Sequence, residues 1–185
     1  MSGIKGVVIL TRFEYIETNF GKDKLIEMID RIDFDNKRRL KQPIGVSKEY
    51  SENLLSAIDK FILKKYFKNN VKKFRELGHW NAPKLVSRYM QILIDEKNPH
   101  AFLMQMIYMR PILFGLGDMQ VVELEKNVYE LSINYGQPFI PSIMESELGF
   151  LEEGCRLCGA ENAEIEILDV GERKIDFILR WIKIN

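Results

Sequence analysis

The chain has 185 residues, of which 46% are apolar and 29% charged, and its 27 basic side chains balance 27 acidic ones. This profile is typical of a globular domain that builds a core without disulfides or metals, and it excludes collagen, coiled-coil fibres and wholesale disorder. The apolar run Val7–Leu10 is too short for a membrane span or a signal peptide. Two cysteines cannot form a disulfide framework, so we expect a cytoplasmic location.

Charge is distributed unevenly along the chain. Residues 37–88 hold 14 basic and 4 acidic side chains, whereas residues 118–176 hold 4 basic and 14 acidic ones. Phe67 and Phe74 stand among the lysines of the basic half, a pattern that can mark a nucleic-acid face. Binding to nucleic acid is the weaker hypothesis, because such domains usually carry a net basic excess. The charge asymmetry also fits a chain in which the charged side chains of each half simply face water. It fits equally a homodimer in which opposite charges meet across a two-fold axis.

The first part of the chain predicts helices. Residues 3–33 have helical spacing, interrupted at Gly21, and residues 35–46 predict a loop. Ser47 is the predicted N-cap of a helix that runs to about Lys65.

Two further helices are expected in the basic half. One covers residues 67–77 and ends at Gly78. The other runs from Pro83 to Asp95, because proline fits the first turn of a helix.

Residues 100–110 are apolar on almost every face, which predicts a buried helix ended by Pro111 and Gly115-Leu116-Gly117. Six of the eight methionines fall between Met90 and Met144, and methionine either fills cores or lines adaptable apolar sites. Core filling is one interpretation, and an apolar pocket for a small ligand is the other. The candidate ligand-binding residues of that pocket are Tyr89, Met90, Phe102, Met106, Met109 and Phe114.

After Gly117 the pattern changes from helical spacing to alternation, which is typical of strands with one buried and one wet face. A helix of about residues 142–158 lies in the middle of this half. The predicted strands are residues 119–124, 128–135, 163–170 and 174–184. We therefore predict a single α+β domain over residues 1–185. A helical layer, residues 1–117, packs on a four-stranded, mostly antiparallel sheet whose ββαββ half covers residues 118–185.

Short motifs stand at both ends of the chain: Gly6-Val7-Val8, Asn19-Phe20-Gly21, Arg110-Pro111-Ile112, Gly149-Phe150-Leu151-Glu152-Glu153-Gly154-Cys155, Ala163-Glu164-Ile165-Glu166 and Asp176-Phe177-Ile178-Leu179-Arg180-Trp181. The first two resemble an uncharacterised, myxobacterial-type protein family. The others resemble the vinyl-4-reductase domain, which is similar in fold to haem-NO-binding (H-NOX) domains and to small TRAPP subunits. The vinyl-4-reductase pattern has a Gly-Asp-Pro-x-Cys turn before its last strand, where this chain has Gly171-Glu172-Arg173-Lys174. The resemblance implies a sensory or adaptor domain with a pocket between helices and sheet.

Cys155 and Cys158 have the spacing of a redox pair or of half a zinc site. Leu148 and Leu151 precede them at helical spacing, which places both thiols on an apolar face. A redox pair sits at a helix N-terminus, where the dipole lowers the thiol pKa, whereas these cysteines lie near a C-terminus. Zinc would need two further ligands. We expect reduced, buried and metal-free thiols.

His100 opens the predicted buried helix. In H-NOX domains a helical histidine from this part of the fold holds the haem iron, and a Tyr-x-Ser-x-Arg signature holds the propionates. The nearest string here, Tyr129-Glu130-Leu131-Ser132-Ile133, has a different spacing and no arginine. His100 follows Pro99, so it could equally be a surface residue of the first turn. We expect no haem, no other cofactor and no metal.

The sequence contains no Ser/His/Asp arrangement, phosphate-binding glycine loop or metal triad, so we predict that the chain is not an enzyme. The favoured interpretation is a sensory or regulatory domain that binds a small apolar ligand. The alternative is a TRAPP-like interaction or dimerisation adaptor with a filled core. Phe13 and Tyr15 are candidates for a homodimer interface, although either could belong to the core.

Overall fold

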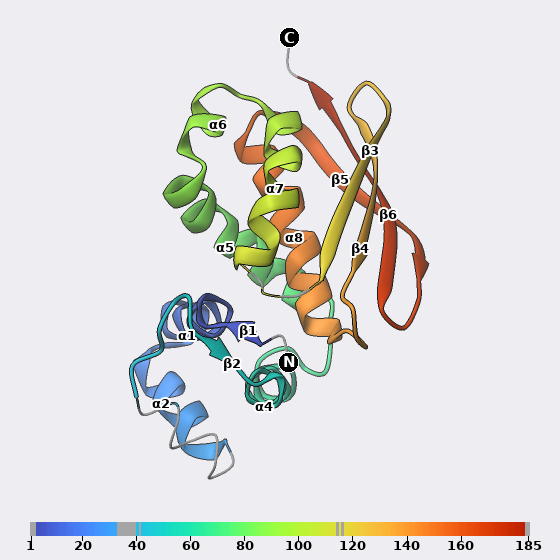
Figure 1. Ribbon diagram of the computed structural model, residues 1–185. Helices are drawn as coiled ribbons and strands as arrows, with labels where there is room; N and C mark the ends of the chain where they lie inside the picture. The colour runs from blue at the N-terminus through green and yellow to red at the C-terminus, as the bar shows by residue number, and fades with distance from the viewer. Residues whose placement is uncertain (1–2, 33–39, 41, 114, 116, 184–185) are drawn as a thin grey trace. The chain divides into compact units, whose positions relative to one another are not determined.

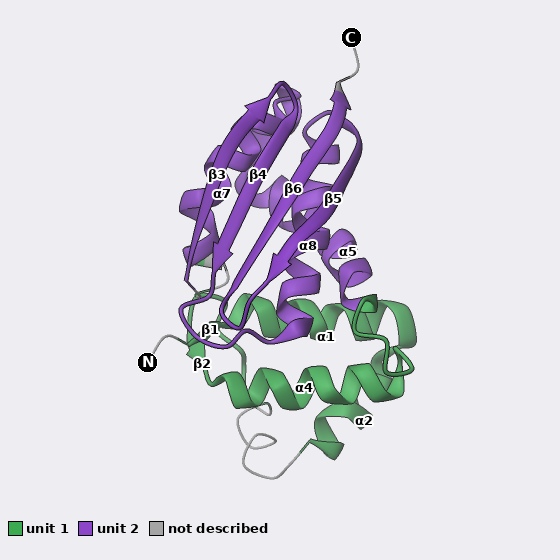
Figure 2. Cartoon of the chain, turned by 90° about the vertical axis from the view of Figure 1, so that its right-hand side faces the viewer, with its two compact units in different colours: residues 1–73, 112–116 green, residues 74–111, 117–185 purple. Residues whose placement is uncertain are grey.

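The computed structural model describes residues 3–32, 40, 42–113, 115 and 117–183 and has an α+β fold (Figure 1). Its elements are β1 (Ile4–Lys5), α1 (Gly6–Phe20), α2 (Lys22–Arg31), β2 (Glu49–Tyr50), α4 (Glu52–Lys65), α5 (Lys73–Tyr89), α6 (Gln91–Asp95), α7 (Pro99–Leu113), β3 (Asp118–Glu125), β4 (Val128–Asn134), α8 (Pro141–Leu157), β5 (Ala160–Val170) and β6 (Lys174–Lys183). Two compact units result: unit 1, residues 1–73 and 112–116, and unit 2, residues 74–111 and 117–185 (Figure 2). None of the described helices is long and apolar enough to span a membrane.

Unit 1 begins with two helices that meet at Gly21, as the sequence predicts. Gly21 has a φ of 96°, a left-handed value that glycine adopts without strain, and its N–H donates to the carbonyl of Glu17. The short antiparallel pair of β1 and β2 was not predicted. A two-residue strand carries too little alternation to be recognised from sequence.

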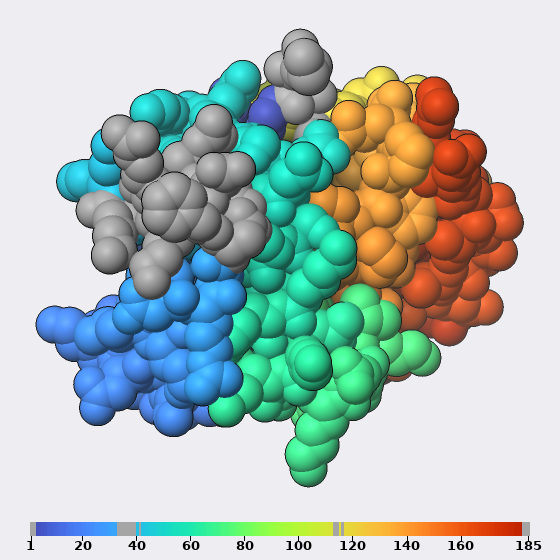
Figure 3. All heavy atoms as spheres, turned by 90° about the horizontal axis from the view of Figure 1, so that it is seen from below, coloured from blue at the N-terminus to red at the C-terminus, as the bar shows by residue number. Residues whose placement is uncertain are grey.

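The helix predicted from Ser47 begins later, so that N-cap prediction is wrong. Ser51 is the N-cap of α4, and its Oγ accepts from the N–H of Leu54 over 3.4 Å. Glu49 and Tyr50 pair with β1 and hold the intervening backbone extended. Lys65 near the end of α4 lies 3.5 Å from a carboxylate oxygen of Glu27 in α2, and Figure 3 shows the two helices side by side.

Unit 2 contains the predicted four-stranded sheet, which is antiparallel throughout in the order β3-β4-β6-β5. One face is apolar because alternate residues of the two central strands are buried. These residues are Tyr129, Leu131, Ile133, Ile175, Phe177, Leu179 and Trp181. Helices α5, α7 and α8 all lie on the same side of the sheet, behind the strands in Figure 2. The predicted ββαββ order is therefore confirmed.

Helix α5 is one continuous helix, so the predicted end at Gly78 and start at Pro83 are both wrong. Gly78 and Gly149 sit where α5 crosses α8. A Cβ at Gly78 would lie 2.1 Å from the carbonyl oxygen of Ser146, and one at Gly149 equally close to that of Arg75. Gly78, which the sequence pattern indicated as a helix terminator, is instead required because the two helices are in close contact.

Helix α7 has one exposed face, so the expectation of a helix buried all round is wrong. Phe102, Leu103 and Met106 are buried, whereas the side chain of Tyr108 is 71% exposed. Pro111 lies within the last turn and does not end the helix. Helix α8 and the sheet cover only the inner face of α7, which leaves apolar residues of the other face in water.

Candidate functional site

The structure buries three of the six predicted ligand-binding residues, Met90, Phe102 and Met106. The ring of Phe102 lies directly over Gly154 of α8 and 6.3 Å from the ring of Phe150. The other three are Tyr89, which is exposed, Met109, which is half-buried, and Phe114, which lies outside the described residues. The helices and sheet of unit 2 thus share an apolar interior around Phe102, and a ligand pocket there stays a prediction.

Both cysteines are unbonded and fully buried, as predicted. Burial raises the pKa of Cys158 to about 11 and that of Cys155 well above its usual value. Both thiols therefore stay protonated at neutral pH, which disfavours redox work. Among the described residues, no group of three or more His, Cys, Asp or Glu side chains could hold a metal ion.

A buried charged cluster that the sequence analysis missed lies inside unit 2. Arg110 of α7 donates two hydrogen bonds to Glu147 of α8, the second over 3.3 Å, and their side chains are 0% and 1% exposed. The hydroxyl of Tyr135 donates to the same carboxylate over 2.8 Å. Burial alone would lower the pKa of Arg110, but the charge and hydrogen bonds of Glu147 together with those of Tyr135 outweigh burial, and the pKa is raised. The arginine thus remains charged inside the fold.

Glu152 of α8 links three elements of unit 2. Its carboxylate lies 2.7 Å from Nε2 of His79 and 3.2 Å from Nε of Arg75, both in α5, and accepts from the N–H of Ile165 in β5 over 3.2 Å. The close crossing at Gly78 and Gly149 brings these groups together. This network holds α5 and β5 against α8.

His100 lies at the beginning of α7 and not in a buried turn. Its Nδ1 is 3.0 Å from the hydroxyl oxygen of Tyr129, and that hydroxyl donates to Glu123 over 3.0 Å. Because the single hydroxyl proton goes to Glu123, His100 Nδ1 is the donor to Tyr129. The ring of Tyr129 stacks on Trp181 with centroids 4.9 Å apart. Burial and the carboxylate of Glu123 raise the pKa of Tyr129 well above its usual value.

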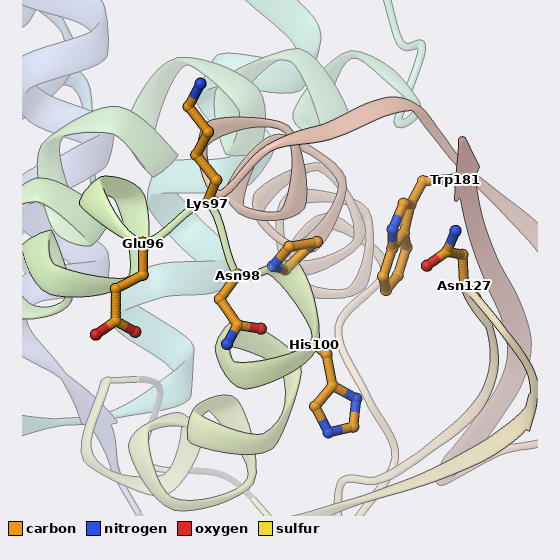
Figure 4. Close-up of a pocket in the computed structure, with 7 residues that line it drawn as sticks. Glu96, Lys97, Asn98, His100, Asn127 and Trp181 are labelled. Carbon is orange, nitrogen blue, oxygen red and sulfur yellow. The ribbon is translucent and has the colours of Figure 1, made fainter. Parts of the chain in front are cut away.

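A pocket of about 190 Å³ opens beside this corner of unit 2. Its lining residues are Glu96, Lys97, Asn98, Pro99, His100, Asn127 and Trp181. Figure 4 shows Trp181 and Asn127 on one side of the pocket and Asn98 and His100 on the other. The sequence analysis missed it because these residues come from three separate segments, the α6–α7 loop, the β3–β4 turn and β6.

Of the four aromatic residues considered for nucleic-acid or dimer contacts, Tyr15, Phe67 and Phe74 are buried in the cores of the two units. Phe67 and Tyr15 pack edge to face in unit 1, with centroids 6.0 Å apart, and Phe74 is fully buried in unit 2. Phe13 is half-buried. The described positions of Phe67 and Phe74 leave neither ring a free face on which a base could stack, so their interpretation as core residues is the better one.

Comparisons with known proteins identify the fold. The chain matches no protein-family model and no curated protein. Among solved structures, it is similar to one from work on heme distortion in the H-NOX family, with a TM-score of 0.75, 16% identity and coverage of 98% of this chain and 97% of that one.

An oxygen-binding H-NOX domain related to soluble guanylate cyclases, in its oxygen complex, has a TM-score of 0.74 at 16% identity, with 96% and 94% covered. An Fe(II) unliganded H-NOX protein from K. algicida has a TM-score of 0.74 at 14% identity, with 97% of each chain covered. The H-NOX-like fold expected from the motifs is thus confirmed, while the vinyl-4-reductase and myxobacterial resemblances stay predictions.

The described residues of unit 2 do not fit a haem. His100 is exposed at the start of α7 and engages Tyr129. Tyr129 and Ser132, the nearest match to the propionate-holding signature, are three residues apart on β4 and point to opposite faces of the sheet. Arg110, a buried cation on the inner side, is already paired with Glu147. The family's haem-holding groups are therefore not reproduced in this part of the chain.

Proposed function

We propose that this chain is a non-catalytic, cytoplasmic sensory domain that binds a small apolar ligand between the helices and the sheet of unit 2. The observation that carries the proposal is the fold shared over 96% of the chain with an oxygen-binding H-NOX domain. A fold alone does not fix a function, so the proposed ligand follows from this chain's own residues.

The residues of the proposed site can adapt to a ligand. Met90 and Met106 are buried, unbranched side chains with several rotatable bonds, and they can reposition without opening the surface. Phe102 packs on Gly154, where the absence of a side chain leaves the ring room against α8. Because haem-holding groups are missing from the described residues, an apolar molecule without iron is the better match.

Xenon is a suitable probe of the site, since it enters dry apolar cavities. With ¹³C-methyl methionine labelling, xenon pressure should shift the Met90 and Met106 resonances in a saturable way. Met28, which is fully buried in unit 1, is the matched internal control, and its methyl resonance should not shift. Equal shifts at all three residues, or none, would contradict the proposal. Native mass spectrometry of the purified protein then reports the retained ligand directly.

A protein-interaction or homodimerisation role is the second candidate, and the outward face of the sheet favours it. Val122 and Ile182 are 55% and 61% exposed there, opposite in register to Glu130 and Glu161. Exposed apolar side chains on a solvated sheet face are candidate docking residues. Sedimentation of a Val122→Asp, Ile182→Asp variant tests this role, because the exchange should convert a wild-type dimer into a monomer. A wild-type protein that is already monomeric at ~10 µM, a concentration matched to micromolar affinity, contradicts the role.

A further inference from the structure

The pocket at the start of α7 carries an inference that is independent of the proposed apolar site. We infer that it binds a small carboxylate-bearing molecule. Three features of the pocket support this: an indole N–H without an acceptor, a helix N-terminus with an open N–H, and side-chain amides on both walls.

Trp181 supplies the first feature. Its side chain is 6% exposed, lines the pocket and stacks on Tyr129, yet its Nε1–H finds no acceptor among the described residues. An unsatisfied buried donor is costly, so an acceptor that reaches it gains more than it would at a solvated N–H. The Nε1 atom exposes less than 1 Å², so a ligand must move a neighbouring side chain to reach it.

The N-terminus of α7 supplies the second feature. Pro99 has no N–H, and Asn98 caps the helix by accepting from the N–H of Ala101 over 2.9 Å. The backbone N–H of His100 has no partner among the hydrogen bonds of the described residues. The 15-residue helix also directs the positive end of its dipole at the pocket, which favours an anion.

The amides of Asn98 and Asn127 supply the third feature. Asn98 uses its Oδ1 for the helix cap, which leaves its NH₂ group to donate. Asn127 sits in the β3–β4 turn with a φ of 64°, and its backbone carbonyl accepts from the N–H of Trp181 over 3.2 Å. Its side chain lies beside the indole in Figure 4. In Figure 4 the amide oxygen of Asn127 faces the indole, and a half-turn of this amide brings its NH₂ group there to donate to a carboxylate.

The charged side chains of the α6–α7 loop lie away from the indole, and the volume of the pocket limits the size of the ligand. In Figure 4 Glu96 lies on the far side of Asn98 from Trp181, and the amine of Lys97 points away from His100. The pocket volume of about 190 Å³ corresponds to roughly six water molecules at ~30 Å³ each. A molecule of a few heavy atoms fills it, which makes acetate a suitable probe.

The test uses the two tryptophans of the chain, Trp80 and Trp181, as reporters. In ¹⁵N-labelled protein at constant ionic strength, acetate should shift the indole N–H resonance of Trp181 in a saturable way and leave that of Trp80 in place. Acetamide has the same shape without the charge and should bind about tenfold more weakly or worse, as expected for loss of a charge-assisted hydrogen bond. Equal binding of acetamide, or no saturable shift with acetate, would overturn the inference.

Two variants separate the site from the fold. Asn127→Gly removes one amide and keeps a backbone suited to positive φ, and it should weaken acetate about tenfold. Asn69→Gly is the matched control, because Asn69 also has a positive φ of 63°, is exposed, and belongs to unit 1. It should leave the acetate affinity unchanged. An Asn127→Gly protein that binds acetate as tightly as wild type would contradict the assignment of this residue.

Discussion

Both units bury an arginine–carboxylate pair, and each pair joins two helices. In unit 1, Arg12 of α1 donates to Asp59 of α4 over 3.1 and 3.5 Å, and both side chains are almost fully buried. In unit 2, the Arg110–Glu147 pair also receives the hydroxyl of Tyr135. Removing the charged members of the unit 2 pair therefore leaves a buried tyrosine hydroxyl without its acceptor.

The largest effect should come from breaking one partner of the unit 2 network. Glu147→Leu leaves the charge of Arg110 buried without its carboxylate and should lower the free energy of unfolding by about 3–5 kcal/mol. Urea unfolding measures the change. A loss below about 1 kcal/mol, which is the contribution of a surface ion pair to stability, would show that the cluster is solvated in the native protein.

Double exchanges sharpen the comparison between the units. Arg12→Met with Asp59→Leu should recover most of the stability that Asp59→Leu alone loses. Arg110→Met with Glu147→Leu should recover less, because the hydroxyl of Tyr135 is left without its acceptor. Adding Tyr135→Phe to the second exchange should restore the missing part. No gain in stability from the added Tyr135→Phe exchange would contradict this role of the hydroxyl.

The helix crossing of unit 2 should be the next most sensitive feature. Gly149→Ala places a Cβ against the backbone of Arg75 and should cost about 1–3 kcal/mol or more, because backbone cannot move aside cheaply. Gly171→Ala is the control, since its nearest neighbour would be 3.5 Å away. Thermal unfolding of the two variants should separate them, and similar midpoints would mean that α5 and α8 are farther apart.

The buried thiols should make stability depend on alkaline pH. With a native pKa of about 11 for Cys158, and one raised well above its usual value for Cys155, the unfolded chain ionises first as the pH rises above about 9. Stability is therefore fully present below pH 9 and is lost between about pH 9 and 11. The Cys155→Ala, Cys158→Ala protein should lose ~1–3 kcal/mol at neutral pH through packing and show a shallower alkaline slope. A parallel slope in both proteins would indicate that the thiols are exposed.

The smallest effect concerns the helix cap of unit 1. Ser51→Ala should cost about 1 kcal/mol, because the N–H of Leu54 loses its acceptor, whereas Ser47→Ala should cost little. Urea unfolding of the two variants compares the N-cap in the structure directly with the one expected from the sequence. The reverse order of effects would place the start of α4 at Ser47.

Local patterns were enough for much of the second half of the chain. Alternation of apolar and polar residues located all four strands of the sheet, and the spacing of Leu148, Leu151 and the cysteines placed both thiols in the core. These patterns are informative because each strand or helix buries one face, and the residues of that face recur at a regular spacing in the sequence. The failures at Gly78 and Ser47 share one cause, which is that contacts with residues distant in the sequence override a strong local preference.

The sequence by itself determined the fold class, the order of strands and helix in the second half, and the burial of the thiols, because each depends on residues within a few turns of one another. Only the tertiary structure decided where Glu147 finds Arg110 and Tyr135, and where Trp181 meets Asn127 and the start of α7. Those groups are separated by tens of residues, and their chemistry arises from helix crossings and strand register that no local pattern encodes.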